Sequence, residues 1–166
     1  MKRRIGIIGK GFVGSAVEFG FSAQTGCDAI LRIYDKDPLK STHTLEETVN
    51  KSDIIFLSVP TPSNTDGSVH LGVLESALED INAVYHKMWD VIIHPIILIR
   101  STVVPGTTKK LQEKFNKLHL VFNPEFLTER SAKFDFINQS RFILGGNHMD
   151  TMRVGIMYKE RFGDSI

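Results

Sequence analysis

The sequence predicts an α/β fold with a doubly wound, mainly parallel six-stranded sheet and helices on both faces. Short runs rich in Ile, Val and Phe alternate along the chain with segments of helical periodicity. The runs are apolar along their whole length, which is typical of parallel strands covered on both sides. A glycine-rich turn also joins the first run to the first helical segment. Together these observations favour an alternating order of strands and helices.

Six apolar runs mark the expected strands. They cover residues 4–8, 29–34, 53–59, 91–101, 118–122 and 141–144. Residues 12–23, 71–85 and 107–115 carry their apolar side chains on one stripe, so we expect helices that pack against the sheet. Thr44 and Glu47 have the spacing of a capping box and predict a short helix through Val49.

The last segment of the chain is expected to lie outside the sheet domain. Residues 1–147 contain all the predicted strands, and residues 148–166 form a tail with helical spacing at Met152, Ile156 and Met157. This tail is predicted to be either a final covering helix or a frayed end.

Length and charge argue against several classes of protein. The 166 residues suffice for one buried core, and 20 basic against 19 acidic residues leave a net charge of +1 without a basic cluster. We therefore expect no nucleic-acid partner. Lys10 and several glycines interrupt the first apolar run, which argues against a signal peptide or membrane contact and predicts a cytoplasmic location.

Cysteine and histidine usage argues against disulfide and metal sites. Cys27 is the only cysteine, so an internal disulfide and a thiolate zinc cluster are excluded. The 6 histidines are not paired at the spacing of metal ligands, and we expect no metal. An isolated cysteine usually packs as a small apolar group, which predicts a structural role for Cys27.

The stretch IGIIGKGFVGSAV has the glycine spacing of a phosphate-binding turn. Gly9 is expected to make the tight turn, Gly11 to let a pyrophosphate approach the backbone, and Gly14 to bring helix and strand together. Phe12 and Val13 begin the helix, whose free N–H groups and positive dipole favour phosphate. The stretch predicts a Rossmann-type domain. The alternative is that the glycines serve a tight turn alone.

An acidic residue follows the second apolar run. At its distance from the glycines, Asp35 is expected to accept hydrogen bonds from the adenosine ribose hydroxyls. Its charge would repel a 2′-phosphate, which favours NAD over NADP, and the adjacent Lys36 weakens this preference only slightly. The alternative is that Asp35 caps a loop.

Three later strand ends carry residues suited to a ligand site, because ligands of such sheets lie beyond the carboxyl ends of the strands. The segment LSVPTPS offers a rigid ledge for a flat ring, RSTVVPGTT offers hydroxyls, and NPEFLTER offers carboxylates. Each also has a simpler explanation as a strand terminator, a helix cap or a first-turn acid. The residues concerned are Val59, Pro60, Thr61, Ser101, Thr102, Glu125 and Glu129.

Several longer segments occur in a specific order. They are IGIIGKGFVGSA, FLSVPTPS, DGSVHLGVLESA, RSTVVPGTT and FNPEFLTERSAKFDF, followed by SRFILGG. In these segments, residues 5–146 resemble the N-terminal NAD-binding domain of the UDP-glucose/GDP-mannose dehydrogenase family. The resemblance implies a nucleotide-sugar dehydrogenase that oxidises a sugar C6 alcohol to a carboxylate with two NAD.

The resemblance also implies roles for individual residues. Thr102 is placed at the nicotinamide and water region, Glu125 is the carboxylate that orients or activates water, and Glu129 lies at the edge of cofactor and substrate. The residues implied to contact the sugar nucleotide are Phe126, Leu127, Thr128 and Glu129.

The family's later regions, which carry its catalytic cysteine and lysine, have no counterpart in this sequence. We therefore expect that the chain alone does not oxidise a nucleotide sugar. One alternative is a compact NAD-dependent dehydrogenase of another small alcohol that uses Glu125 and Thr102, and another is a non-catalytic, nucleotide-responsive binding module. An apolar face left bare by the missing region predicts a homo-oligomer or a complementing subunit.

Overall fold

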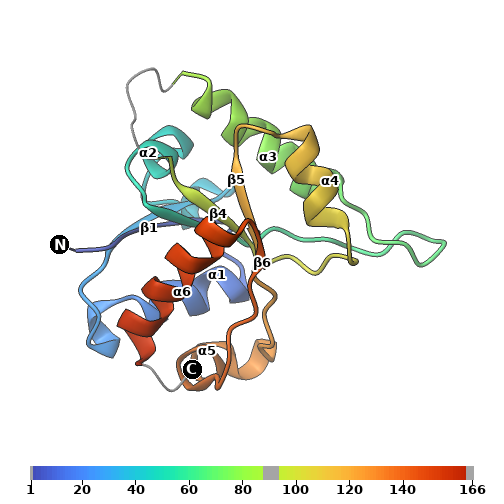
Figure 1. Cartoon of the computed structure of the whole chain (residues 1–166). Helices are drawn as coiled ribbons and strands as arrows, with labels where there is room; N and C mark the ends of the chain where they lie inside the picture. Colours follow the sequence, from blue (N-terminus) through green and yellow to red (C-terminus); the bar gives the residue numbers. More distant parts are fainter. Residues whose placement is uncertain (1, 88–93, 164–166) are drawn as a thin grey trace.

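The computed structural model describes residues 2–87 and 94–163, which form a six-stranded sheet in the order β2-β1-β3-β4-β5-β6 (Figure 1). The strands are β1 Arg4–Ile8, β2 Ile30–Tyr34, β3 Ile54–Leu57, β4 Ile96–Ile99, β5 His119–Phe122 and β6 Gly145–Gly146. Strands β1 to β5 are parallel, and β6 runs antiparallel to β5. Because β2 and β3 lie on opposite sides of β1, the strand order reverses there, at the position where such sheets bind ligands.

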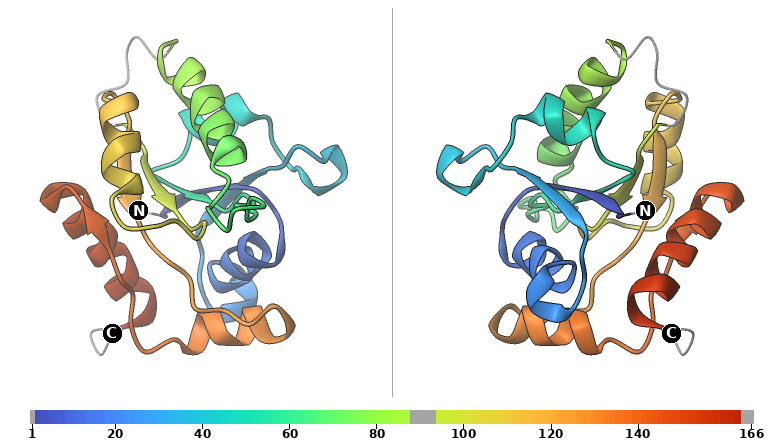
Figure 2. Two further views of the ribbon diagram at one scale, coloured as in Figure 1. Left: turned by 90° about the vertical axis from the view of Figure 1, so that its right-hand side faces the viewer. Right: turned by 90° about the vertical axis from the view of Figure 1, so that its left-hand side faces the viewer.

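Helices cover both faces of this sheet, as predicted (Figure 2). They are α1 Phe12–Gly20, α2 Leu45–Asn50, α3 Gly72–Tyr85, α4 Thr107–Lys114, α5 Ala132–Asn138 and α6 His148–Phe162, with short 3₁₀ turns η1 Ala23–Thr25, η2 Pro38–Lys40 and η3 Glu129–Ser131. Helices α1, α5 and α6 pack on one face, and α2, α3 and α4 on the other. Within the described residues, no helix is long and apolar enough to cross a membrane.

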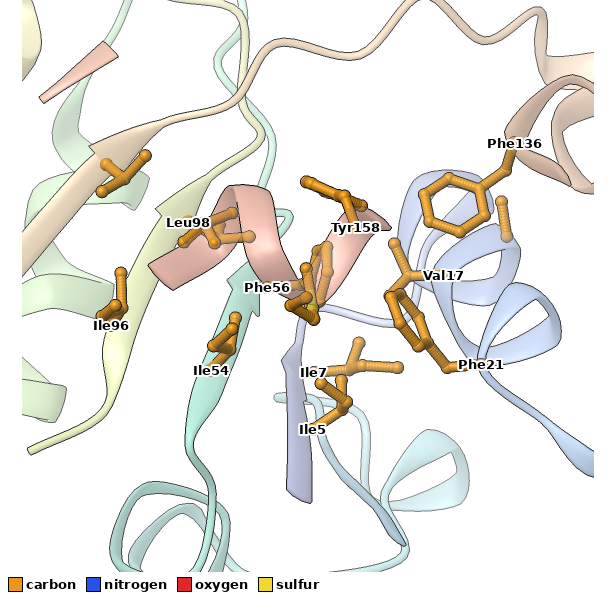
Figure 3. Close-up of a cluster of buried hydrophobic side chains, with 14 of the residues drawn as sticks. Ile5, Ile7, Val17, Phe21, Ile54, Phe56, Ile96, Leu98, Phe136 and Tyr158 are labelled. Carbon is orange, nitrogen blue, oxygen red and sulfur yellow. The ribbon is translucent and has the colours of Figure 1, made fainter. Parts of the chain in front are cut away.

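Each face has its own hydrophobic core, because successive strand residues point to opposite sides. On the α1 side, the Phe56 ring lies at the centre, with its centroid 5.5 Å from that of Phe21 and 6.4 Å from that of Tyr158. Figure 3 shows this cluster, to which β1, β3, β4, α1, α5 and α6 all contribute. The sequence-predicted α/β fold is confirmed.

The C-terminal segment forms a covering helix through Phe162 and shares the core of the sheet. Val154, Met157 and Tyr158 of α6 are buried in the α1-side cluster. Asn147 caps the helix by accepting a hydrogen bond from the Met149 amide at 2.9 Å. The division into a domain over 1–147 and a tail over 148–166 stays a prediction.

The predicted capping box is confirmed. The Thr44 hydroxyl accepts a hydrogen bond from the Glu47 amide, and the Glu47 carboxylate accepts one from the Thr44 amide, each at 3.1 Å. These two bonds satisfy amide groups that the short helix α2 would otherwise leave free at its start.

The strand expected over residues 141–144 is wrong, since the sixth strand is the two-residue β6 instead. Phe142 turns into the core and stacks on Tyr158 with ring centroids 3.7 Å apart. The Ile143 carbonyl accepts a hydrogen bond from the Asn123 side chain at 3.0 Å instead of from a neighbouring strand. Of the expected strand over 91–101, residues 91–93 lie outside the described residues and β4 occupies 96–99.

Replacing the central core ring tests this packing. Phe56→Ala is expected to lower the free energy of unfolding by about 3–5 kcal/mol, because it removes a fully buried aromatic side chain and leaves a cavity. Leu39→Ala is the matched control, since Leu39 is 96% exposed, and it should change stability by less than about 0.5 kcal/mol. Urea unfolding measures both, and equal losses would contradict the assignment of the core.

Candidate functional site

Two adjoining cavities lie beyond the carboxyl ends of the parallel strands. The first, of about 360 Å³, is lined by Gly9, Asp35 and Lys36 among others, and we call it the Asp35 cavity. The second, of about 290 Å³, contains Glu125 and is called the Glu125 cavity. The residues that line both are Gly11, Ser58, Val59 and Pro60. The two cavities therefore meet at the start of α1 and the end of β3.

The three glycines of the first turn are required for different reasons. Gly9 has a φ of +90°, and a Cβ there would lie 2.3 Å from the Ser58 carbonyl oxygen. A Cβ on Gly14 would lie 2.1 Å from the Gly9 carbonyl oxygen. A Cβ on Gly11 would meet no atom within 4 Å. The chain itself thus explains Gly9 and Gly14, whereas Gly11 borders both cavities and leaves room for a ligand.

The start of α1 offers a site for an anionic group. Gly11 is the N-cap residue, no side chain caps the helix, and the first turn contains no acidic residue. The first N–H groups of an α-helix lack partners within the helix and carry its positive dipole end. Since Gly11 lines both cavities, these groups are available to a phosphate there.

Asp35 is tied to the glycine turn. Its carboxylate accepts hydrogen bonds from the backbone amides of Lys10 at 2.6 Å and Asp37 at 2.8 Å, one on each oxygen. An ionised carboxylate has about four acceptor positions, so each oxygen retains capacity for a further donor. Asp35 therefore does cap a loop, and this role leaves it able to accept hydrogen bonds from ribose hydroxyls.

The wall of the Glu125 cavity consists of strand ends that are joined by hydrogen bonds. The Ser101 hydroxyl donates to the Val59 carbonyl at 2.6 Å, and the Thr61 hydroxyl donates to the Thr102 carbonyl at 2.8 Å. Each bond links the segment after β3 to the segment after β4. The structure thus brings Val59, Pro60, Thr61, Ser101 and Thr102 together, as the sequence predicted, although their roles toward a cofactor stay predictions.

Glu125 and Glu129 lie in different places. The Glu125 carboxylate accepts a hydrogen bond from the Leu127 amide at 2.6 Å and borders the same cavity as Thr102. Glu129 borders a separate depression with Ser15, and Phe12 is common to the two. Glu125 and Glu129 are only four positions apart in the sequence, but their carboxylates face separate depressions and do not act on one site together.

The remaining predicted substrate residues make contacts within the chain. Leu127 packs against the α1-side core. Phe126 is half exposed, with the Arg141 guanidinium 5.6 Å from its ring centroid. The Thr128 amide donates to Asp135 at 2.8 Å. Contacts of this segment with a sugar nucleotide stay a prediction.

Sequence reasoning missed a buried polar network next to this site. Arg100 is 2% exposed and lines the Glu125 cavity, and its Nη1 donates to the Asn123 side-chain oxygen at 2.8 Å. The Tyr158 hydroxyl donates to the same oxygen at 2.5 Å. Burial raises the pKa of Tyr158 to about 12, although the nearby Arg100 charge acts in the opposite direction. The signal available in the sequence was an arginine at the end of an otherwise apolar run.

Cys27 is remote from these cavities. It follows η1 and precedes β2, so it lies toward the amino ends of the strands, and it packs against the α1-side core. It thus packs as a small apolar group, as expected, and its structural role stays a prediction. In the part of the chain that the structure describes, no group of three or more His, Cys, Asp or Glu side chains is arranged to hold a metal ion.

A parallel sheet, a glycine turn opening onto a helix N-terminus and an acid at the end of β2 define a Rossmann-type dinucleotide-binding domain. The family model described as "UDP-glucose/GDP-mannose dehydrogenase family, NAD binding domain" matches residues 25–161, and the chain belongs to this family. Its cofactor is NAD, and the resemblance predicted from the sequence is confirmed. The match begins after the glycine turn, so the geometry of that turn supports a dinucleotide site independently of the family match.

Individual relatives agree with the family. The chain is 31% identical to the UDP-glucose 6-dehydrogenase AglM of Haloferax volcanii over 74% of this chain and 30% of that protein. It is 28% identical to the UDP-glucose 6-dehydrogenase of Campylobacter jejuni over 93% of this chain and 44% of that protein. A solved UDP-glucose dehydrogenase from Pyrobaculum islandicum has the same fold, with a TM-score of 0.77 and 24% identity over 96% of this chain and 44% of that one. The chain thus spans less than half the length of these relatives.

Alanine substitutions separate the glycines by their roles. Gly9→Ala and Gly14→Ala should each lower the free energy of unfolding by about 1–3 kcal/mol, because a Cβ must displace a backbone carbonyl and, at Gly9, adopt a left-handed conformation. Gly11→Ala should stay within about 1 kcal/mol of the parent, the usual range for a change at an N-cap. Urea unfolding of the three variants checks this order, and a Gly11→Ala loss as large as the others would contradict it.

Proposed function

We propose that this chain is the NAD-binding part of a nucleotide-sugar 6-dehydrogenase of the UDP-glucose type. The placement of the cofactor rests on Gly11. This residue lies where the two cavities meet at the start of α1, and its lack of a side chain keeps that junction open. The diphosphate would bind there, the adenosine in the Asp35 cavity and the nicotinamide in the Glu125 cavity.

The residues around the nicotinamide end would position the reaction. When bound, NAD accepts the hydride removed from the alcohol carbon. Thr102 and the ledge at Pro60 would hold the ring, and Glu125 would take a proton or hold a water next to the reacting carbon. Since the Leu127 amide fixes one oxygen of Glu125 at 2.6 Å, the carboxylate has a defined orientation for this task.

The substrate and the complete oxidation need more than these residues. We propose that residues 126–129 contact the sugar nucleotide at the mouth of the cavity, with Glu129 on the far side of Phe12. The thiol of Cys27 lies away from Glu125, so the acyl intermediate of a four-electron oxidation has no nucleophile here. A complementing subunit would supply it, and these 166 residues alone would bind NAD without oxidising a nucleotide sugar.

Calorimetry with dinucleotides tests the cofactor site. The parent should bind NAD more tightly than NADP, because Asp35 lies where a 2′-phosphate would be repelled. Gly11→Ala should weaken NAD binding by about tenfold or more, corresponding to about 1.4 kcal/mol, while leaving the fold intact. Leu39→Ala, in an exposed position, should bind as the parent does. Unchanged NAD affinity in Gly11→Ala would remove the support for this placement.

Absorbance measurements distinguish the proposed function from a self-sufficient dehydrogenase. The purified chain with NAD and UDP-glucose should form no NADH, and the same assay with a panel of small alcohols tests the compact-dehydrogenase alternative. NADH formation from UDP-glucose that is lost in Glu125→Gln would contradict the need for a complementing nucleophile. Failure to bind any dinucleotide would favour the non-catalytic binding module.

A further inference from the structure

Asp80 is a second acidic residue in the wall of the Asp35 cavity. It belongs to α3 and lines this cavity together with Val73 and Ala77 of the same helix. These three residues are spaced by four and three positions, so they lie on one face of α3. This face of α3 therefore forms one wall of the cavity, and the wall includes a carboxylate.

The walls of the Asp35 cavity suit a flat, uncharged ring. Val73 and Ala77 of α3 and Leu45 of α2 supply apolar surface. Sites for small molecules typically combine such surface with a few polar groups that fix the orientation of the ligand. The charged side chains that line this cavity are those of Asp35, Lys36, Lys40 and Asp80.

Helix α3 leads away from the proposed diphosphate site. Its start is held near the segment after β3, because the His70 amide donates a hydrogen bond to the Pro62 carbonyl at 2.7 Å. Since α3 joins the end of β3 to the start of the parallel strand β4, it runs opposite to both strands. Asp80 comes two helical turns after Val73, about 10 Å along the helix axis. Asp80 is therefore farther than Val73 from the carboxyl ends of the strands.

The carboxylate of Asp80 is available to a ligand. Asp80 is exposed, and no described residue donates a hydrogen bond to it or lies within the 4.0 Å of an ion pair. The adjacent Glu79 is paired with Lys114 at 3.1 Å and does not line the cavity. Asp35, in the same cavity, already accepts hydrogen bonds from two backbone amides. Asp80 thus retains all of its acceptor positions for a molecule in this space.

We propose that Asp80 recognises the adenine base of NAD by accepting a hydrogen bond from its exocyclic amino group. This inference rests on the proposed placement of the adenosine in the Asp35 cavity. With the diphosphate at Gly11 and the ribose at Asp35, the base is the next part of the cofactor along the cavity. The amino group of adenine is a donor, whereas an ionised carboxylate only accepts hydrogen bonds. Hypoxanthine has a carbonyl oxygen at that position, so it would place two acceptors against each other.

Calorimetry with NAD and with nicotinamide hypoxanthine dinucleotide tests this role. The two dinucleotides differ only in the base, so the effect of the Asp80 charge on the diphosphate cancels in the ratio of their dissociation constants. The parent should bind NAD about tenfold more tightly, as expected for one hydrogen bond to a charged group. In Asp80→Asn the ratio should fall to about two or less, because a side-chain amide can donate as well as accept. Since Asp80 is exposed, this substitution should leave the fold intact.

Glu79→Gln is the matched control, because it removes a neighbouring negative charge of α3 that lies outside the cavity, and it should keep the ratio of the parent. A parent ratio near one, or an unchanged ratio in Asp80→Asn, would overturn the role of Asp80. Tighter binding of the hypoxanthine dinucleotide would also overturn it and would assign the base to Lys36 or Lys40. Binding of neither dinucleotide would instead overturn the proposed cofactor site, and this inference with it.

Discussion

The contact between Gly14 and the carbonyl oxygen of Gly9 fixes where α1 begins, and the ligand edge of the sheet depends on it. The space at Gly14 is too small for a Cβ, so the helix can meet the turn only without a side chain. The glycine turn is also hydrogen-bonded to the end of β2. The Gly9 amide donates to the Tyr34 carbonyl at 2.9 Å, and the Lys10 amide donates to the Asp35 carboxylate. One close contact therefore sets both the direction of the α1 amides and the position of Asp35.

A second set of bonds holds the opposite wall of the site. The segments after β3 and β4 are joined by hydrogen bonds from the Ser101 and Thr61 hydroxyls to backbone carbonyls. The segments after β4 and β5 are joined by the side-chain pair of Arg100 and Asn123. Tyr158 extends this set to α6, which is the last helix among the described residues. Residues on rigid strands keep a defined geometry when further hydrogen bonds support their side chains. Here a helix that is distant in the sequence supplies one of these hydrogen bonds. Helix α6 is thus hydrogen-bonded, through Asn123, to the segments that follow β4 and β5.

Sequence periodicity predicted the parallel strands because each strand is apolar enough to be recognised from its own residues. It failed over residues 141–144 because Phe142 and Leu144 are apolar for another reason: they pack against the α1-side core without forming a strand. The glycine turn and Asp35 were predictable since their geometry depends on neighbours close in sequence. Arg100 and Asn123 were not, because their partners lie 23 and 35 positions away. Glu125 and Glu129 were grouped by their spacing, but Leu127 between them turns into the core and separates them.

Arg100 and Glu125 both border the Glu125 cavity, and each side chain is hydrogen-bonded to a neutral group. Arg100 is oriented by a neutral amide oxygen and Glu125 by a neutral backbone amide, so each side chain has a fixed direction while its charge is retained. Electrostatic interactions strengthen where water is excluded, so the orientation of a buried charge matters more than that of an exposed one. The neutral partners therefore fix the directions of the Arg100 and Glu125 side chains without forming an ion pair with either of them.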